Sequence, residues 1–367
     1  MSTTPTPSAD YDDWTQVLFS HLGERSLRYL DERVAEAFTS SIAGKTKPGF
    51  AIGAYVDEGS YGEVNRYARE EVDRGAQALL FRLYRQPDDR DIARILKNID
   101  AATIGLHCSL RYPGQDPAEL FRDLVTYLRR EGYQLDQVSG SVDFDPLLDW
   151  TDPPFPPLVR LLFFVSRWMP QFKVLQVNAA GFNNGPELAD TEIALALAKG
   201  AEYLRAIEAH GYPAGLACHH LQFALTVGTS YHVDVAKLRA LRTLWLRVLE
   251  EFGVTGAPPV VVAAHTDTTS LTDDWAENQD SLRAQAHAAV AGGADLVYLT
   301  PLEQVDDTPT LRARKFTMET QQQLQRGFSP IADDEHLAII TEELVAAAWG
   351  KYQHLVAQGG FALAMEF

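Results

Sequence analysis

Residues 172–211 read FKVLQVNAAGFNNGPELADTEIALALAKGAEYLRAIEAHG, a pattern that decides the fold. A short apolar run at 174–177 ends at Asn178, and a loop of Gly and Asn residues follows. Pro186 then occupies a first helical position, acidic residues fill the opening turn, and Gly211 follows the last apolar residue of the helical pattern. The stretch therefore predicts one strand–loop–helix unit whose loop carries the polar side chains.

The same unit recurs along the chain. Apolar runs without alternation are typical of parallel strands buried on both faces, and their alternation with helical patterns indicates βαβ units. The predicted strands are residues 50–56, 78–83, 103–108, 137–142, 174–177, 216–225, 260–264 and 296–299. The predicted helices are residues 61–74, 88–98, 117–131, 157–168, 186–210, 231–252, 273–291, 311–326 and 336–358. Eight strands favour a closed (β/α)8 TIM barrel. An open doubly wound sheet is the alternative, but no G-x-G-x-x-G motif follows the first strand.

Two segments precede the predicted barrel domain, which spans residues 46–367. Residues 1–10 have neither a basic start nor an apolar centre, so they predict a disordered tail and not a signal peptide. Residues 11–45 predict an N-terminal helical extension, because apolar side chains from Trp14 to Leu30 recur along one side.

The composition excludes several classes of protein. A formal net charge of −18 argues against binding to nucleic acid or to an anionic membrane, both of which need basic patches. No apolar run reaches the ~20 residues of a membrane span. Two cysteines, Cys108 and Cys218, cannot form a disulfide framework, which favours a reducing compartment. We therefore expect a cytoplasmic protein.

Polar residues follow the predicted strands, where the reactive groups of such barrels lie. His265, followed by Asp267, is a candidate acid or base, and His107 is a similar one. Asp143 and Asp145 would share a face of an extended strand and pair their carboxylates. Hydrogen-bonded barrel histidines and solvated carboxylates are the alternatives. The polar residues at the predicted strand ends are Tyr84, Arg85, His107, Cys108, Asp143, Asp145, Asn178, His219, His220, His265, Asp267 and Thr300.

Two patterns that suggest a metal or cofactor are rejected. His219 and His220 are adjacent, so on a strand they point to opposite faces and cannot share one ligand set. We expect no metal site. Residues 334–339, DEHLAI, begin like the D-x-H-x-x-G signature of cobalamin domains, but the glycine is missing and a helix begins there.

The order of several segments is similar to a known family. They are MPQFKVLQVNAAGFNNGPELADTEIALALAKGAEYLRA (169–206), VAKLRALRTLWLRVLEEFG (235–253), AHTDTTSLTDDWAENQDSLRA (264–284), ADLVYLTPLE (294–303) and AWGKYQHLVAQGGFA (348–362). From Trp14 to the C-terminus the chain resembles the barrel domain of methylmalonyl-CoA mutase. The resemblance implies adenosylcobalamin-dependent radical isomerisation of methylmalonyl-CoA and succinyl-CoA. It also implies a CoA ester along the barrel axis and a separate flavodoxin-like domain that holds the cobalamin.

The chain departs from the catalytic members of that family at two loops. Ala180 and Gly181 stand where those chains carry a Tyr-His pair after the fifth strand. Asp143 stands in the segment that in those chains reads T-I-Q-N-D and precedes a carboxylate-binding arginine, and no arginine occurs here before Arg160. A substrate carboxylate would be repelled by Asp143 and Asp145. The cobalamin-binding domain is absent from the sequence.

The resemblance therefore implies a non-catalytic small subunit that forms a heterodimer with a catalytic large mutase subunit. Such a chain binds no cofactor by itself, and adenosylcobalamin belongs to the assembly. One alternative is an active enzyme: a divergent acyl-CoA mutase that uses a separate cobalamin-binding chain, or a barrel with new chemistry at His265 and Asp267. Another is a barrel that binds a CoA ester or another small molecule without turnover. Few cations lie at the strand ends apart from Arg85 and Arg111, which disfavours a CoA phosphate site.

Overall fold

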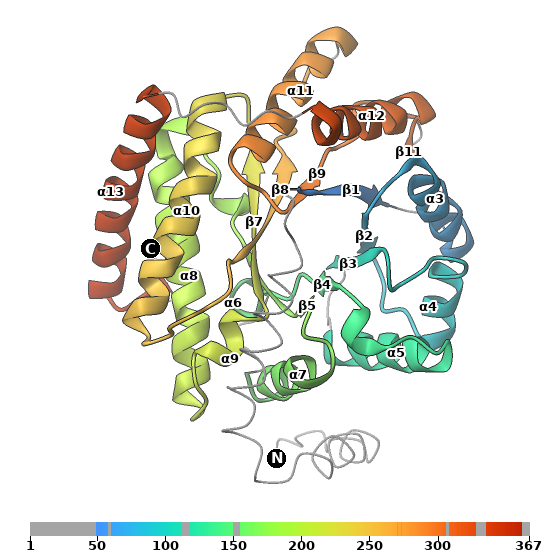
Figure 1. The fold of residues 1–367 in the computed structure, drawn as a ribbon, viewed down its shortest axis with the longest axis horizontal. Coiled ribbons are helices and arrows are strands. Elements are labelled where there is room, and N and C mark those ends of the chain that lie inside the picture. The colour runs from blue at the N-terminus through green and yellow to red at the C-terminus, as the bar shows by residue number, and fades with distance from the viewer. Residues whose placement is uncertain are drawn as a thin grey trace, which may run out of the picture.

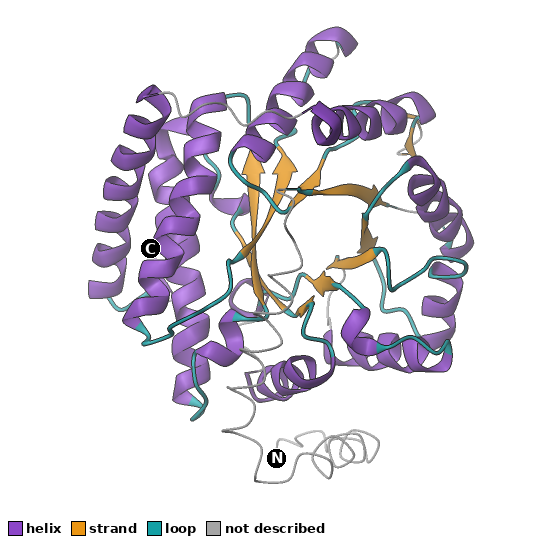
Figure 2. Ribbon diagram, viewed as in Figure 1, coloured by secondary structure: helices purple, strands orange, loops and turns teal. Residues whose placement is uncertain are grey.

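The computed structural model describes residues 49–57, 60–111, 117–149, 155–269, 271–272, 274–305, 308–327 and 335–361. Parallel strands form a ring at the centre of the molecule, and helices surround that ring (Figures 1 and 2). The prediction of a (β/α)8 barrel is confirmed. The predicted tail (1–10) and helical extension (11–45) lie outside the described residues.

The barrel strands are short and lie in the order β5-β4-β3-β2-β1-β9-β8-β7-β6. Their bounds are β1 Ala51–Val56, β2 Ala78–Leu83, β3 Gly105–Leu110, β4 Gly140–Val142, β5 Phe172–Lys173, β6 Leu175–Asn178, β7 Leu221–Val227, β8 Val261–Thr266 and β9 Leu296–Tyr298. β5 and β6 are one strand interrupted at Val174, since β5 pairs with β4 and β6 pairs with β7. The amide of Gln176 donates a hydrogen bond of 3.0 Å to the carbonyl oxygen of Phe144, which links β6 to the chain that leaves β4.

The helices follow the strands and begin and end at recognisable signals. They are α3 Tyr61–Arg74, α4 Asp89–Ile95, α5 Pro117–Arg130, α6 Pro146–Asp149, α7 Phe155–Trp168, α8 Ala189–Ala209, α9 Gly215–Cys218, α10 Tyr231–Glu251, α11 Trp275–Ala291, α12 Leu311–Gly327 and α13 Glu335–Ala357. Ser60 and Glu63 form a capping box before α3, and Asp88 and Asp274 cap α4 and α11. α13 packs against α8 and α10 on the outside of the barrel (Figure 1).

The strands separate two apolar regions. Outward side chains such as Ile52, Phe81 and Phe223 pack against the helices in the main core. Inward side chains form a smaller cluster inside the barrel, which contains Leu80, Ala263, Leu296 and Tyr298. Successive side chains of a strand point to opposite faces, so each strand supplies both regions.

Several predicted strands differ in their bounds from the observed ones, and two of these differences change the positions assigned to histidines. Residues 215–218 form the helical turn α9, so β7 begins only at Leu221, where it pairs with Leu175. His219 and His220 therefore lie before β7, at its amino end, and their prediction as strand-end residues is wrong. β3 continues to Leu110 because it pairs with all of β2, so His107 lies within the strand and not at its end.

None of the helices in the described part of the chain is long and apolar enough to cross a membrane. A short antiparallel hairpin, β10 Gln304–Val305 and β11 Thr308–Pro309, precedes α12.

Candidate functional site

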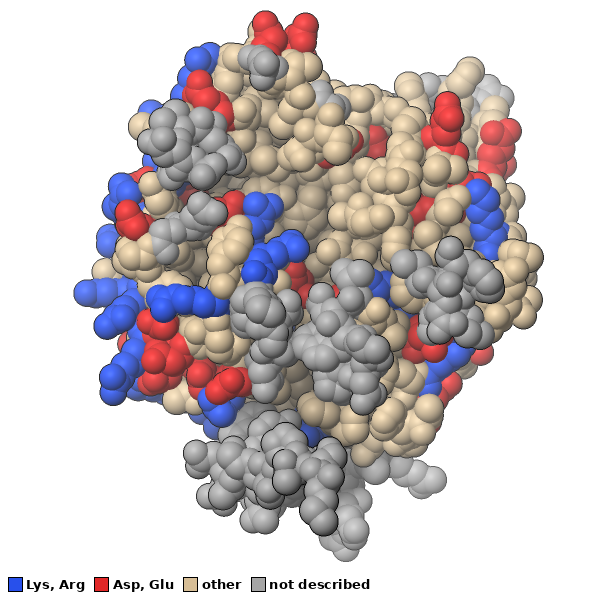
Figure 3. All heavy atoms as spheres, turned by 180° about the vertical axis from the view of Figure 1, so that it is seen from behind, with Lys and Arg blue, Asp and Glu red and all other residues tan. Residues whose placement is uncertain are grey.

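A cavity of about 220 Å³ lies inside the barrel, toward the carboxyl ends of the strands. Its walls are inward side chains of β1–β4 and β6–β9 and of the residues that follow those strands. The face of the molecule seen in Figure 3 is hollowed near its centre, with Lys or Arg side chains beside the hollow. Its polar and aromatic lining residues include Tyr55, Arg82, His107, Ser109, Arg111, Asp143, Asn178, Gln222, His265 and Tyr298.

Tyr298 on β9 lies across the inside of the barrel. Its ring stacks on His265 at a centroid distance of 5.1 Å and an interplanar angle of 12°, and it lies 5.5 Å from the ring of Tyr55. A Cβ atom added to Gly53 would lie 2.5 Å from the Tyr298 ring and 2.6 Å from the carbonyl oxygen of Val297. Only glycine on β1 leaves room for this ring, so Tyr298 is built into the barrel.

His265 forms a hydrogen bond with Tyr55, whose ring lies next to the cationic side chain of Arg82. The Tyr55 hydroxyl lies 2.7 Å from Nδ1 of His265, and the Arg82 guanidinium lies 4.3 Å from the centre of the Tyr55 ring. Burial, with the nearby Arg82 and Arg111 charges, lowers the pKa of His265 to about 3. Burial raises the pKa of Tyr55 to about 12. Both side chains are therefore neutral at physiological pH, and His265 is a poor general base.

A second polar network crosses the barrel at His107. Its Nδ1 lies 2.7 Å from Oγ of Ser141, and Gln222 donates from Nε2 to Ser141 at 3.0 Å and to Gln176 at 2.6 Å. Burial lowers the pKa of His107 to about 4. Burial and Asp143 raise the pKa of the neighbouring Cys108 thiol to about 12, so this cysteine is not a nucleophile at neutral pH.

The structure does not bring Asp267 to His265. The Asp267 carboxylate accepts hydrogen bonds from the amide and hydroxyl of Thr269, at 2.8 and 2.7 Å, and thereby closes a turn after β8. No hydrogen bond or ion pair joins it to His265, whose hydrogen-bond partner is Tyr55. These two residues do not form an acid–base pair in this structure.

Asp143 and Asp145 are also separated, contrary to the shared face expected from their spacing. β4 ends at Val142, so the chain is no longer extended there. Asp143 faces the cavity and accepts a 2.9 Å hydrogen bond from the amide of Leu110. Asp145 is buried behind the barrel wall, where Lys199 and Tyr203 of α8 donate to it.

Asn178 lies where the sequence predicts it, at the carboxyl end of β6 and at the cavity wall. Its amide donates to Asp145 at 3.0 Å, and its side-chain oxygen accepts from the amide of Ala180 at 3.2 Å. Both hydrogen bonds fix the backbone of the loop after β6. Asn178 is therefore a residue that positions this loop.

Sequence reasoning did not single out Tyr55, Arg82, Ser109, Gln222 or Tyr298. These residues lie within strands that read as apolar runs, so they resemble core residues. The available signal was the alternation of side chains along each strand, which places 296, 298 and 300 on one face with the cavity.

Because His107 and His265 are buried inside the barrel, we expect the stability of the fold to fall at acidic pH. A histidine whose folded pKa is below its unfolded value of about 6.5 binds a proton more readily when unfolded, so stability falls as pH drops below about 6.5. For His265 the loss continues to about pH 3, its folded pKa. At about pH 5.5 each such histidine costs about 1.4 kcal/mol. Thermal melts between about pH 7 and 5 measure this loss.

The matched variants are His265→Gln and His354→Gln. His354 is exposed on α13, so its replacement should leave the pH dependence of the melting temperature unchanged. His265→Gln should flatten that dependence. An identical pH profile for His265→Gln and the unchanged chain would contradict the assignment.

Cobalamin does not fit inside this barrel. A corrin ring is larger than the cavity of about 220 Å³. His336 lies in the first turn of α13. Within the described ranges, no group of three or more His, Cys, Asp or Glu side chains could hold a metal ion.

The model of the methylmalonyl-CoA mutase family matches residues 88–367. A small subunit of methylmalonyl-CoA mutase from Porphyromonas gingivalis (strain ATCC BAA-308 / W83) is 24% identical over 323 residues, which are 83% of this chain and 52% of that protein. A probable small subunit from Mycobacterium bovis (strain ATCC BAA-935 / AF2122/97) is 30% identical over 250 residues, 64% of this chain and 40% of that protein.

A large subunit from Propionibacterium freudenreichii subsp. shermanii is 26% identical over 260 residues, 66% of this chain and 36% of that protein. The chain thus spans 36% to 52% of the length of these relatives. The match to the family model runs from the start of α4 through α13 and includes most of the barrel strands. This chain therefore belongs to the methylmalonyl-CoA mutase family.

Proposed function

We propose that this chain is the barrel of a small subunit, without catalytic activity of its own, in an adenosylcobalamin-dependent methylmalonyl-CoA mutase assembly. A catalytic large subunit is its partner, and the assembly interconverts methylmalonyl-CoA and succinyl-CoA. Relatives named as small and as large subunits support an assembly of two kinds of chain.

The loop after β6 is the observation that carries this proposal. Ala180 and Gly181 are exposed in that loop, at the positions where the resemblance places a Tyr-His pair in catalytic chains. A Cβ atom added to Gly181 would meet no atom within 4 Å, so a larger side chain has room there. The loop therefore lacks a reactive group although space for one exists.

The interior of the barrel supports the same proposal. Tyr298, His265 and Tyr55 occupy the region through which the acyl arm of a CoA ester would pass. The cavity of about 220 Å³ is smaller than the roughly 300–1,000 Å³ of most ligand pockets. A CoA ester cannot lie along this axis without displacement of the rings.

The proposed location is the cytoplasm. Cys108 and Cys218 are both free thiols within the fold. Free thiols are typical of proteins in a reducing compartment.

Co-expression with the large mutase subunit of the same organism tests the proposal. We expect the two chains to co-purify, and methylmalonyl-CoA turnover with adenosylcobalamin only in preparations that contain the large chain. The controls are each chain alone with the cofactor. Turnover by this chain plus adenosylcobalamin alone would indicate a divergent acyl-CoA mutase, and failure to co-purify would refute the heterodimer.

Gly181→His is the matched variant, because it adds an imidazole where the space is open. It should fold and co-purify as the unchanged chain does, since the interface does not depend on this position in the proposal. Loss of co-purification in this variant would place the loop in the interface instead.

A further inference from the structure

Three buried polar side-chain atoms at the cavity have no hydrogen-bond partner among the described residues. They are Oγ of Ser109, Oε1 of Gln222 and the hydroxyl of Tyr298, and each of the three side chains is 2% exposed. An unsatisfied buried polar group costs about 1–3 kcal/mol, and folded proteins leave few of them. Their convergence on one cavity indicates that a polar molecule occupies it.

The charges around the cavity favour an anion. Arg111 follows β3 and lines the cavity, and its guanidinium forms no ion pair with any residue that the structure describes. Arg82 also lines the cavity, but Asp57 binds it at 2.9 Å. The lining thus carries two guanidinium groups and one carboxylate, that of Asp143, which accepts a hydrogen bond from the amide of Leu110 at 2.9 Å. Among the described residues that line the cavity, the groups left to donate to an anion are therefore the Arg111 guanidinium and two hydroxyls, whereas the Gln222 amide oxygen can only accept.

The size and floor of the cavity restrict the anion further. At about 30 Å³ per water, a volume of about 220 Å³ holds roughly seven waters, or one small organic molecule. Leu80, Ala263 and Leu296 supply an apolar surface inside the barrel. A ligand with one charged end and a short apolar chain matches both features.

We propose that this barrel binds a short-chain free carboxylic acid in its ionised form. Arg111 and the hydroxyls of Ser109 and Tyr298 donate to the ligand's oxygen atoms, and its alkyl chain contacts Leu80 and Leu296. The proposal goes beyond a non-catalytic subunit, because it gives the barrel a ligand of its own. It does not depend on the partner chain.

Isothermal titration calorimetry of the isolated chain tests this proposal with three probes that share a four-carbon acyl group. Butyrate is the charged acid, butyramide is its neutral isostere, and butyryl-CoA is the thioester. We expect butyrate to bind about tenfold more tightly than butyramide, because a hydrogen bond to a charged group is worth about 1.5–3 kcal/mol. Butyryl-CoA should not bind, since the cavity is too small for the CoA group that is attached through the thioester.

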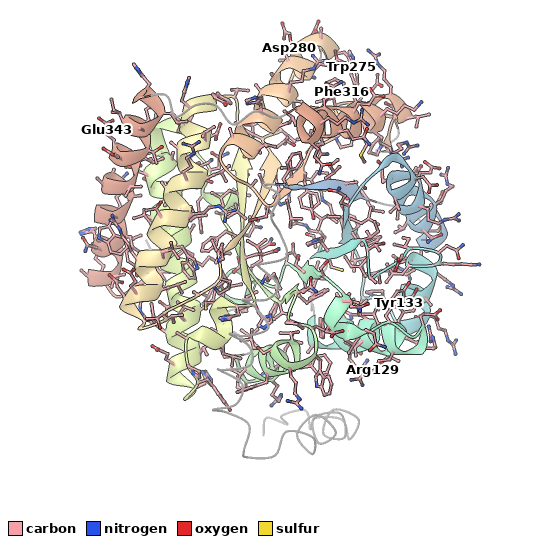
Figure 4. The ribbon with its side chains drawn as sticks, viewed as in Figure 1. Arg129, Tyr133, Trp275, Asp280, Phe316 and Glu343 are labelled. Carbon is pink, nitrogen blue, oxygen red and sulfur yellow. The ribbon has the colours of Figure 1, made fainter. Side chains whose placement is uncertain are left out.

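Arg111→Leu should weaken butyrate binding about tenfold or more. Its side chain makes no ion pair among the described residues, so the fold should be unaffected. Arg129→Leu is the matched control, because Arg129 is exposed on the outer side of α5, away from the cavity (Figure 4). It should leave the affinity unchanged.

Tyr298→Phe separates ligand binding from a structural role. Removal of a hydroxyl that has no partner among the described residues should raise the melting temperature and should also weaken butyrate binding about tenfold. Equal affinities for butyrate and butyramide, an unchanged affinity in Arg111→Leu, or no heat at about 10 mM butyrate would overturn the proposal. The last result would mean that only water satisfies these groups. None of these outcomes bears on co-purification with a large subunit.

Discussion

Asp145→Ala is expected to lower the free energy of unfolding by about 3–5 kcal/mol, because it removes the carboxylate that pairs with a buried ammonium group. Lys199 is fully buried in α8 and donates to Asp145, as does the hydroxyl of Tyr203. The same carboxylate accepts a 3.0 Å hydrogen bond from the amide of Asn178. One side chain thus joins the chain after β4 to β6 and α8. Urea unfolding followed by circular dichroism measures the loss.

Asp280→Ala is the matched control for Asp145→Ala. Asp280 forms a 2.9 Å ion pair with Arg283, but both side chains are exposed. Asp280 lies near the outer end of α11 (Figure 4). Exposed pairs contribute about 0–1 kcal/mol, so this variant should unfold almost as the unchanged chain does. Similar losses in the two variants would show that burial does not set the value of the Asp145–Lys199 pair.

Gly140→Ala is expected to abolish folding or to cost more than about 4 kcal/mol, which is exceptional for a single substitution. Gly140 begins β4 with a φ of 155°, a conformation that other residues rarely adopt. It pairs with Leu106 of β3, and an added Cβ would overlap the Leu106 carbonyl oxygen and lie 2.6 Å from its carbon. Backbone blocks this position, so no side-chain rotation relieves the overlap. Soluble yield and thermal melts measure the effect.

Gly181→Ala is the control for Gly140→Ala. Gly181 lies in a short helical turn after β6, its φ is not positive, and an added Cβ would meet no atom within 4 Å. The free energy of unfolding should change by less than about 1 kcal/mol, since alanine also restricts the unfolded chain. A Gly140→Ala protein that melts within a few degrees of the unchanged chain would contradict the assigned close approach of β3 and β4.

The elements of the barrel follow from local patterns. The helix predicted at 61–74 and the strand predicted at 78–83 have the observed bounds, because a capping serine, a closing glycine and a continuous apolar run are all local signals. The strand predicted at 216–225 was shifted. Residues 216–218 are apolar, which is compatible with a strand and with a helical turn. The pairing of Leu221 with Leu175 of β6 sets the first residue of β7.

The candidate site was predicted only in part. His265, Asp143 and Asn178 do lie at the cavity, because strand ends meet at one rim of a parallel barrel. Asp267 does not line the cavity, because its carboxylate accepts a hydrogen bond from the amide of Thr269 in the turn after β8. Tyr298 escaped prediction because an aromatic residue in an apolar run looks the same whether it points to the helices or to the cavity.

The sequence by itself determined the eightfold strand–helix repeat, the family and the absence of a Tyr-His pair after the fifth strand. Each of these is written in neighbouring residues. Only the tertiary structure decided which polar residues share a site. Asp143 and Asp145 are two residues apart, yet one faces the cavity and the other binds Lys199, which lies 54 positions later in the chain. The physical reason is that a buried carboxylate is stable only next to groups that pair with its charge or donate hydrogen bonds to it. Those groups come close to Asp145 only when the barrel closes.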